Sequence, residues 1–301
     1  MKVLIAADIA KEAIDLLSDD FEIELATGLS EDELAEKIAG FDAIAVRSKP
    51  KVTKKILDNA KDLKLVARAG VGLDNIDLDT CKERGIKVVN SPTALSESVA
   101  ELVFAMILSF NRNIIKADNG MKKGLWEKKN LKGTEVHGKT IGIVGFGRIG
   151  SHIAKIANGY GMKVIAFDVN KDEEMAEKLG VEYKELDELI KVSDYLTLHV
   201  PLIPPTRGMI SMPQLEMMKD NALLINTARG GVVNEDDLFK ALSNGTIRGA
   251  CLDVYENEPP KDSPLATLDN VLMTPHIGAS TAEAQTKAGI IIAQKIIEEL
   301  G

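Results

Sequence analysis

Three residues in the second half of the sequence, Arg229, Glu258 and His276, are suited to acid–base chemistry on an anion. Arg229 stands in NTARGG, directly after the apolar run ALLI and between small residues that cannot cover its charge. A guanidinium stays protonated at any working pH and offers a planar set of donors that fits a carboxylate. The sequence therefore predicts that Arg229 binds an anionic group of a ligand.

The histidine of MTPHIGAS, His276, follows a predicted strand, at the edge of a parallel sheet where ligands bind. Histidine carries a proton near neutral pH, and a neighbouring carboxylate fixes its tautomer and holds it ready as a base. Glu258, in the proline-bounded loop DVYENEPP, is the candidate for that carboxylate, although a single loop glutamate is usually solvated. His137 and His152 are expected to be structural or solvated, and His199 to lie in the core or in a pocket wall.

The segment GKTIGIVGFGRIGSHIAK places Gly145, Gly147 and Gly150 between a β-branched strand and an amphipathic helix. This context is required of the G-x-G-x-x-G fingerprint, in which pyrophosphate approaches free amides at a helix start. Asp168, at the end of the next strand, would accept hydrogen bonds from ribose hydroxyls and repel a 2′-phosphate, which favours NAD over NADP. The alternative is a tight turn without a ligand and a surface aspartate.

Parallel sheets must position these residues, because short β-rich runs alternate with helical segments in both halves of the chain. The first series of runs covers residues 2–8, 21–27, 43–48, 63–70 and 86–92. The second covers residues 140–145, 163–168, 195–200, 222–227, 248–254 and 271–276. The pattern predicts an α/β protein with two sheets.

Two apolar helices are expected where the two domains join. The first carries the S-x-x-E capping box at Ser98 and Glu101, and the last segment carries one at Ser280 and Glu283. The last helix is expected to return to the first domain. The predicted domains are residues 1–95 with 281–301, and residues 96–280.

Composition limits the classes of function. The chain has 301 residues, 45% of them hydrophobic, which suits two domains with cores of their own. A net charge of −9 and 4% aromatic residues argue against nucleic-acid partners, and no apolar run is long enough for a membrane span. Cys81 and Cys251 stand far apart, so a cytoplasmic protein without disulfides or a metal site is expected.

The motifs VRSKPKVT, RAGVGLDNID, GIVGFGRIG, HVPL, NTARGGVVNEDDL, LDVYENEPP and TPHIGAS occur in this order along the chain. In this the sequence resembles the D-isomer-specific 2-hydroxyacid dehydrogenases, from the first strand to the last helix. The resemblance implies two doubly wound parallel-sheet domains, a Rossmann cofactor domain inserted into a flavodoxin-like substrate domain. It also implies NAD-dependent hydride transfer, in which Arg229 binds the substrate carboxylate and carbonyl oxygen, His276 is the acid/base and Glu258 orients it.

The same resemblance implies a set of NAD contacts at the strand ends and at the glycine turn. These are Gly145, Gly147, Arg148, Ile149, Gly150, Asp168, Val200, Pro201, Thr227, Ala228, Asp253, Gly278 and Ala279.

In the first domain the expected substrate contacts are Arg47, Ser48, Arg68, Ala69, Gly70 and Val71. Both arginines stand at predicted strand ends that face the cleft. The resemblance implies that they lie at its substrate end, where they suit the phosphate of D-3-phosphoglycerate, and the amides of AGVG suit its carboxylate. Surface charges without a ligand are the plain alternative. Leu95 stands where many phosphoglycerate-oxidising members have a small polar residue, and no feedback through a C-terminal regulatory domain is expected. Reduction of glyoxylate or hydroxypyruvate is the nearest enzymatic alternative.

The basic segment MKKGLWEKKN holds the only tryptophan, Trp126, and resembles the inter-subunit arm of the family. A homodimer formed by the cofactor domains is therefore expected, with a solvated loop as the alternative. Some proteins of this fold act instead as NAD-sensing binding proteins, and the sequence leaves that class open.

Overall fold

Two parallel β-sheets organise the chain, and the computed structural model describes all of residues 1–301. The chain divides into two compact units, one made of Met1–Leu95 with Ala279–Gly301 and the other of Ser96–Gly278. The second transition falls after Gly278, where the sequence suggested Ser280. The predicted fold class, two doubly wound α/β domains with one inserted into the other, is confirmed.

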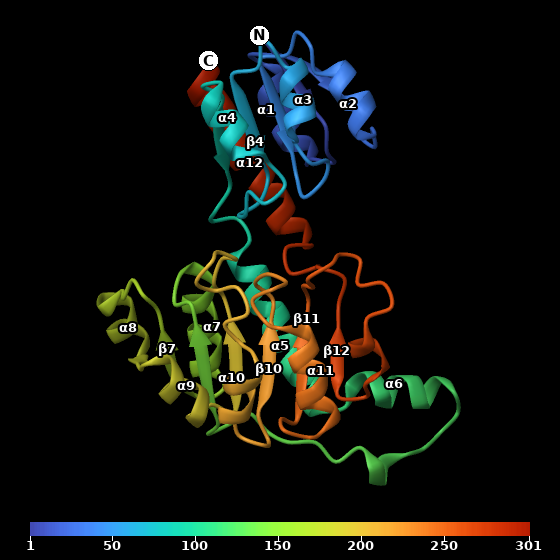
Figure 1. Ribbon diagram of the computed structural model, residues 1–301, viewed down its shortest axis with the longest axis vertical. Coiled ribbons are helices and arrows are strands. Elements are labelled where there is room, and N and C mark those ends of the chain that lie inside the picture. Colours follow the sequence, from blue (N-terminus) through green and yellow to red (C-terminus); the bar gives the residue numbers. More distant parts are fainter. The chain divides into compact units, whose positions relative to one another are not determined.

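The first unit holds a five-stranded sheet in the order β2-β1-β3-β4-β5, with helices on both faces (Figure 1). This is the flavodoxin-like order, whose direction switches between β1 and β3. Alternate strand residues pack against α1 and α12 on one face and against α2, α3 and α4 on the other. The strands are β1 (Lys2–Ile5), β2 (Glu22–Leu25), β3 (Ala43–Val46), β4 (Leu65–Arg68) and β5 (Lys87–Asn90). The helices are α1 (Lys11–Ser18), α2 (Glu31–Lys37), α3 (Lys54–Asn59), α4 (Leu78–Glu83) and α12 (Ala282–Leu300).

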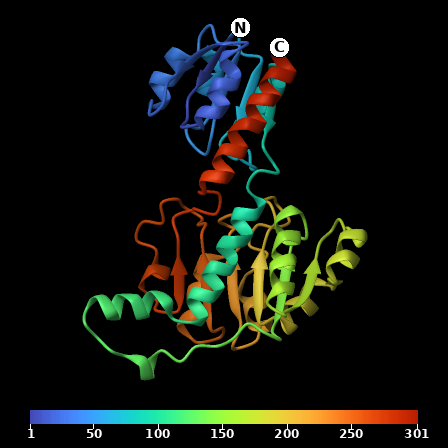
Figure 2. The ribbon, with the colours of Figure 1, turned by 180° about the vertical axis from the view of Figure 1, so that it is seen from behind.

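The second unit holds a seven-stranded parallel sheet in the order β12-β11-β10-β9-β6-β7-β8. Read from β8, this is the Rossmann order, with the switch point between β6 and β9. Helices α5 and α7 cover one face, seen from behind in Figure 2, and α9, α10 and α11 cover the other. The strands are β6 (Thr140–Val144), β7 (Lys163–Phe167), β8 (Glu182–Tyr183), β9 (Tyr195–Leu198), β10 (Leu223–Asn226), β11 (Gly249–Leu252) and β12 (Val271–Met273). The helices are α5 (Ser96–Asn111), α6 (Ile114–Lys122), α7 (Arg148–Gly159), α8 (Glu173–Leu179), α9 (Leu186–Val192), α10 (Met212–Met217) and α11 (Glu235–Ser243), with 3-10 turns η1 (Lys128–Asn130) and η2 (Pro264–Thr267).

Both predicted capping boxes at the domain junctions are wrong. Helix α5 already begins at Ser96, so Ser98 lies inside its first turn, and Glu97 supplies the acidic side chain near the helix start. Helix α12 is capped by Thr281, whose hydroxyl accepts a 3.2 Å hydrogen bond from the amide of Ala284. At α12, Thr281 can cap the helix as well as the neighbouring Ser280, and α5 begins two residues before Ser98, so the S-x-x-E spacing alone misplaces both starts.

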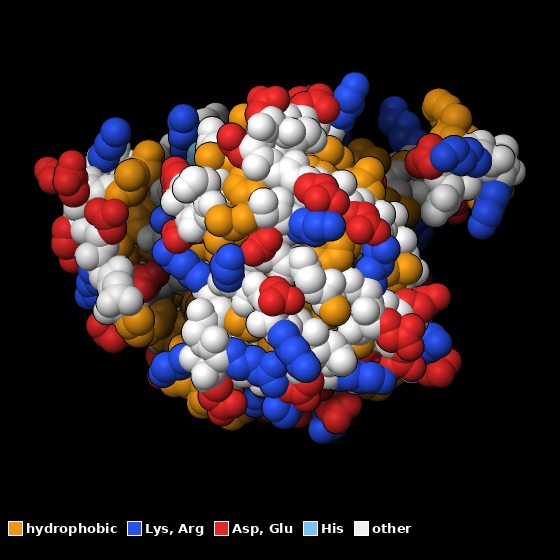
Figure 3. Space-filling view, turned by 90° about the horizontal axis from the view of Figure 1, so that it is seen from above, with side chains coloured by type: hydrophobic (Ala, Val, Ile, Leu, Met, Phe, Trp, Pro, Cys, Tyr) orange, Lys and Arg blue, Asp and Glu red, His pale blue; other side chains and the backbone are white.

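No single helix has both the length and the apolar composition needed to cross a membrane, although α5 and α6, which meet at a 62° bend, satisfy these criteria as a pair. The face drawn in Figure 3 carries acidic and basic side chains intermingled over most of its area. This mixture fits a chain whose charges do not form one broad field of a single sign.

Candidate active site

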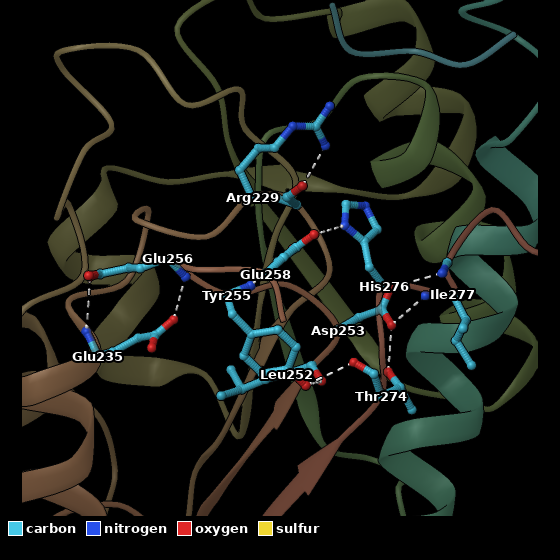
Figure 4. Close-up of polar contacts among 12 residues, drawn as sticks. Arg229, Glu235, Leu252, Asp253, Tyr255, Glu256, Glu258, Thr274, His276 and Ile277 are labelled. Carbon is cyan, nitrogen blue, oxygen red and sulfur yellow. Dashed lines mark hydrogen bonds and ion pairs between the residues drawn. The ribbon is translucent and has the colours of Figure 1, made fainter. Parts of the chain in front are cut away.

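Three neighbouring strands of the second unit bring the predicted acid–base residues together. Strand β10 pairs with β11 and β11 pairs with β12, all parallel, so their carboxyl ends lie at one edge of the sheet. Arg229 follows β10, Glu258 follows β11 and His276 follows β12. Figure 4 shows these side chains as neighbours above the strand ends. The sheet topology therefore assembles at one edge three residues that are far apart in sequence.

His276 and Glu258 form a direct pair. The Nδ1 atom of His276 lies 2.8 Å from Oε2 of Glu258, with the two side chains 46% and 37% exposed (Figure 4). A carboxylate at this distance holds the Nδ1 proton, which leaves Nε2 as the nitrogen that can take a proton from a ligand. The pair is half-open to solvent, as a group that must meet a small ligand requires.

The backbone at His276 is held in a conformation that few residues adopt. Its φ of 53° lies in the left-handed region, which residues with a side chain usually avoid and which recurs at functional sites. Asp253, only 1% exposed, fixes this turn by accepting hydrogen bonds from Thr274 Oγ1 (2.5 Å) and from the amides of Ile277 and Gly278 (both 2.8 Å). Sequence reasoning expected Asp253 to contact the cofactor and missed this role, because it depends on pairing between distant segments.

The turn that carries Arg229 is held by Asn226. The Asn226 side chain accepts a 3.1 Å bond from the amide of Ala228 and donates a 3.0 Å bond to the carbonyl of Arg229. The half-buried guanidinium of Arg229 donates from Nη1 to the carbonyl of Ala228 at 2.6 Å. Asn226 is itself 2% exposed, so the turn that carries Arg229 is held by a buried side chain at the end of β10.

The loop that carries Glu258 is tied to the start of α11. The amide of Glu256 donates to Oε1 of Glu235 at 2.6 Å, and the amide of Glu235 donates to Glu256 at 3.5 Å (Figure 4). Burial raises the pKa of Glu235, while the hydrogen bond from Glu256 opposes this. This reciprocal contact fixes the loop on one side of the acid–base pair.

The glycine turn after β6 has the shape needed to admit a dinucleotide. A Cβ added to Gly145, whose φ is 98°, would lie 2.5 Å from the carbonyl oxygen of His199, and one added to Gly150 would lie 2.6 Å from that of Gly145. A Cβ on Gly147 would meet nothing within 4 Å, so this side of the turn is open. Helix α7 starts directly after Gly147 without a side-chain cap, with Arg148 exposed and Ile149 half-buried. Free amides at such a start are available to the phosphates of NAD.

Asp168 stands beside this turn, at the end of β7. Its Oδ2 accepts a 2.7 Å hydrogen bond from the amide of Phe146, inside the glycine turn, and its Oδ1 accepts a 2.8 Å bond from Asn170. Each carboxylate oxygen has a second lone pair left for a ribose hydroxyl. The side chain can therefore both hold the turn and contact the adenosine ribose.

Two polar groups at the ends of β9 and β10 are buried without a protein partner. They are Oγ1 of Thr227 and Nδ1 of His199, whose Nε2 lies 2.7 Å from Oγ1 of Thr197. Burial lowers the pKa of His199 to about 3, so its ring is neutral at working pH. Orphaned buried polar atoms usually have a ligand or water to satisfy them, so Thr227 fits a cofactor contact. Of the other expected contacts, Ala228 and Gly278 are buried, Val200 and Ala279 are half-buried and Pro201 is exposed.

In the first unit, Arg47 directly follows β3, and Arg68 ends the neighbouring strand β4. Arg47 Nη1 donates to the carbonyl of Asp8, after β1, at 3.3 Å, which places the guanidinium at the β1–β3 switch point. Arg47 has no carboxylate within ion-pair distance. The carbonyl of Arg47 is held by Asn75 Nδ2 at 2.8 Å, a contact that sequence reasoning did not single out.

The turn after β4 offers fewer free amides than the sequence suggested. The amide of Ala69 donates to the carbonyl of Val46 at 2.8 Å, and that of Gly70 donates to Oγ of Ser91 at 2.8 Å. The amides of Val71 and Gly72 have no protein acceptor. These two amides are therefore the ones left for an anion. Ser48, which follows Arg47 in the sequence, is exposed.

No group of three histidine, cysteine or carboxylate side chains is arranged to hold a metal ion. The residues at these edges can support proton transfer at His276 and anion binding by guanidinium and amide groups.

Comparison with known proteins gives a consistent set of similarities. The sequence profile described as "D-isomer specific 2-hydroxyacid dehydrogenase, NAD binding domain" matches residues 104–278. The chain is 49% identical over 98% of its length to D-3-phosphoglycerate dehydrogenase of Methanocaldococcus jannaschii, but spans only 57% of that relative. It is also 49% identical, over 97% of its length, to hydroxypyruvate reductase of Thermotoga maritima, of which it spans 95%. D-lactate dehydrogenase from Aquifex aeolicus, complexed with NAD and lactic acid, has a TM-score of 0.86 at 33% identity, with 99% of this chain and 95% of that chain covered.

Proposed function

This chain belongs to the D-isomer specific 2-hydroxyacid dehydrogenase family, whose NAD-binding domain its second unit contains, and on that premise we propose that it oxidises D-3-phosphoglycerate with NAD. The observation that carries the proposal is the His276–Glu258 pair, at the sheet edge that also holds Arg229. A base and a carboxylate-binding cation are the two groups that oxidation of a 2-hydroxy acid needs from the protein.

The side chains have distinct roles in this proposal. Arg229 binds the substrate carboxylate and polarises the oxygen on C2, which fixes the reacting carbon in position. His276 accepts the hydroxyl proton at Nε2, because its Nδ1 is held by Glu258 at 2.8 Å. Glu258 then stabilises the positive charge on the ring. The glycine turn and Asp168 would hold NAD, which would supply the acceptor for the hydride from C2.

The phosphate of the substrate is assigned to Arg47. Its guanidinium lies at the switch point of the five-stranded sheet and has no carboxylate partner, while the Val71 and Gly72 amides have no protein acceptor. A charged group left without a counter-ion fits a site for an anion. Hydroxypyruvate reduction is the second candidate, because the Thermotoga maritima relative of that name is equally similar and nearly equal in length.

An assay of NADH formation separates these candidates. The substrates are D-3-phosphoglycerate, D-glycerate and D-lactate, with the L-isomers as controls. In the reverse direction, 3-phosphohydroxypyruvate, hydroxypyruvate and glyoxylate are tested with NADH. The proposal expects kcat/KM to be highest for D-3-phosphoglycerate. A higher value for hydroxypyruvate than for 3-phosphohydroxypyruvate would favour the second candidate, and NAD binding without turnover of any acid would contradict both.

We further propose that the chain forms a homodimer through α6 and the segment after it. Five large apolar side chains there are between 47% and 79% exposed, a concentration that isolated surfaces rarely carry. They are Ile114, Ile115, Met121, Leu125 and Trp126. Sedimentation should give a dimer at micromolar concentration, and Trp126→Asp should shift it toward the monomer. A wild-type monomer under these conditions would contradict the proposal.

A reducing compartment, such as the cytoplasm, is proposed as the location. Cys81 and Cys251 are both unpaired and buried, which is typical of proteins that do not use disulfides. Fractionation of cells that express the full-length protein would test this.

A further inference from the structure

Tyr255, in the loop between β11 and Glu258, contacts the three segments that carry the acid–base residues. The residue is 5% exposed, and its ring lies below the Glu258 carboxylate in Figure 4. Burial raises the pKa of Tyr255 to about 12, so its hydroxyl remains a hydrogen-bond donor at any working pH. A tyrosine buried at the end of a strand, with its hydroxyl bonded to backbone, usually fixes the chain around it.

The first contact is with the Arg229 turn. A Cβ added to Gly230 would lie 1.8 Å from the carbonyl oxygen of Tyr255 and 2.6 Å from the amide of Glu256. The backbone of the Arg229 turn therefore packs directly on the backbone of Tyr255, and any side chain at position 230 would force the two segments apart.

The second and third contacts reach both members of the acid–base pair. The amide of Tyr255 donates to Oε1 of Glu258 at 3.3 Å, while Oε2 of the same carboxylate holds His276. The hydroxyl of Tyr255 lies 2.8 Å from the carbonyl of Thr274 and 3.0 Å from that of Leu252. Thr274 lies two residues before His276, and its carbonyl also accepts the His276 amide at 3.1 Å. One residue thus fixes the path of the chain into the left-handed turn at His276.

We propose that Tyr255 is a positioning residue. It fixes the positions of the Arg229 turn, the Glu258 carboxylate and the His276 turn relative to one another. The expected changes in kcat and KM rest on the proposed function. The expected change in the position of the His276 ring does not depend on turnover. The hydroxyl acts on the proton-transfer step through His276, and the carbonyl acts on substrate binding through Gly230 and Arg229.

The hydroxyl is tested with Tyr255→Phe, which keeps the ring in place. Losing one buried hydrogen bond should lower kcat about 5- to 10-fold, with little change in KM or in the dissociation constant of NADH. Tyr195→Phe is the matched control, because Tyr195, at the start of β9 in the same unit, is 2% exposed and its hydroxyl accepts a 2.7 Å bond from Asn111. This control should keep the wild-type kcat. Equal losses in the two variants would show a merely structural role and overturn the proposal.

A second substitution tests the carbonyl contact. Gly230→Ala should raise KM for the hydroxy acid about 10- to 100-fold, because a displaced Arg229 no longer meets the substrate carboxylate. Gly159→Ala is the control, since a Cβ there would meet nothing within 4 Å. A wild-type KM in Gly230→Ala would contradict this part of the proposal.

Two further readouts separate this inference from the proposed function. In a His276→Gln background, Tyr255→Phe should change the residual kcat by no more than about twofold, because the two residues act on one step. In protein with ¹⁵N-labelled histidine at fixed pH, Tyr255→Phe should shift the ring signals of His276, and Tyr195→Phe should not. If the wild type oxidises no hydroxy acid but these signals still shift, the proposed function fails and the positioning role stands. Unshifted signals would overturn the positioning role whether or not the wild type is active.

Discussion

The carboxyl edges of the two sheets satisfy their polar groups in different ways. At the edge of the seven-stranded sheet, His276 is bonded to Glu258 at 2.8 Å, and Asp253 accepts three hydrogen bonds from the turn around His276. At the edge of the five-stranded sheet, Arg47 makes one 3.3 Å bond to a carbonyl and has no carboxylate partner, and the Val71 amide has no protein acceptor. The turn around His276 is therefore held by hydrogen bonds within the protein, whereas the Arg47 side chain and the Val71 amide keep donors that a ligand can use.

This difference suits two separate tasks. Groups that act on a proton gain from a fixed geometry, because a preorganised site needs no rearrangement when charge develops. Groups that recognise an anion gain from donors without strong protein partners, because binding then replaces only water. We therefore expect changes at the His276 turn after β12 to act on kcat, and changes at Arg47 after β3 to act on KM, as changes at the anion-binding Arg229 also should.

The largest effect should come from His276→Gln. This change removes the base and should lower kcat by about 10²- to 10⁴-fold, while the dissociation constant of NADH stays near the wild-type value. Steady-state NADH formation and a fluorescence titration with NADH measure the two quantities. His137→Gln, at an exposed histidine, is the control and should remain fully active. Near-wild-type turnover in His276→Gln would contradict the assignment of the base.

The next largest effect should come from Arg47→Ala. Losing a charged hydrogen-bond donor to a phosphate should raise KM for D-3-phosphoglycerate about 10- to 100-fold and leave kcat nearly unchanged. KM for D-glycerate, which lacks the phosphate, should not change. Lys51→Ala removes the same charge from an exposed position of the following segment and serves as the control. An equal rise in KM for both acids would show that Arg47 does not recognise the phosphate.

Much of this comparison could be predicted from the sequence. The alternation of β-rich runs and helical segments fixed two parallel sheets, and the carboxyl ends of parallel strands must share one edge, so Arg229, Glu258 and His276 were expected together. Their pairing at 2.8 Å between His276 and Glu258 agrees with that expectation. The glycine fingerprint likewise predicted a turn in which Gly145 and Gly150 leave no space for a side chain.

The contacts that hold the site residues in place could not be predicted. They join residues that are distant in sequence, and many of them use backbone amides and carbonyls, which nearly every residue type can offer. Tyr255 acts through a carbonyl, an amide and a hydroxyl, and only the hydroxyl distinguishes it from phenylalanine. The amide of Gly70 is taken by Ser91, which lies on another strand end, so the sequence overstated the donors free for an anion. The helix starts were misplaced for a related reason, since Thr281 and Ser280 are equally able to cap.

A smaller effect, on stability, should follow from His199→Gln at the end of β9. Burial lowers the pKa of His199 to about 3, so between pH 6.5 and pH 3 the unfolded chain binds a proton that the folded chain does not. This contribution therefore lowers the free energy of unfolding as the pH falls through that window, by about 2 kcal/mol at pH 5. Guanidinium denaturation at pH 7 and pH 5 should show a smaller loss in His199→Gln than in the wild type. Equal losses in the two proteins would mean that the ring is not kept neutral by burial.

The smallest effect should come from Ser91→Ala, at the carboxyl edge of the five-stranded sheet. Ser91 is fully buried, and its Oγ accepts the Gly70 amide at 2.8 Å, so its loss leaves that amide without its acceptor and loosens the turn that ends in Val71. We expect about 1 kcal/mol less stability and a rise of about 2- to 5-fold in KM for the hydroxy acid, with kcat unchanged. Ser18→Ala removes a hydroxyl bonded to Ile14 in α1 of the same unit and should leave KM at the wild-type value. If Ser91→Ala instead lowered kcat at constant KM, the first unit would take part in the chemistry itself, and the division of tasks between the two sheet edges would be wrong.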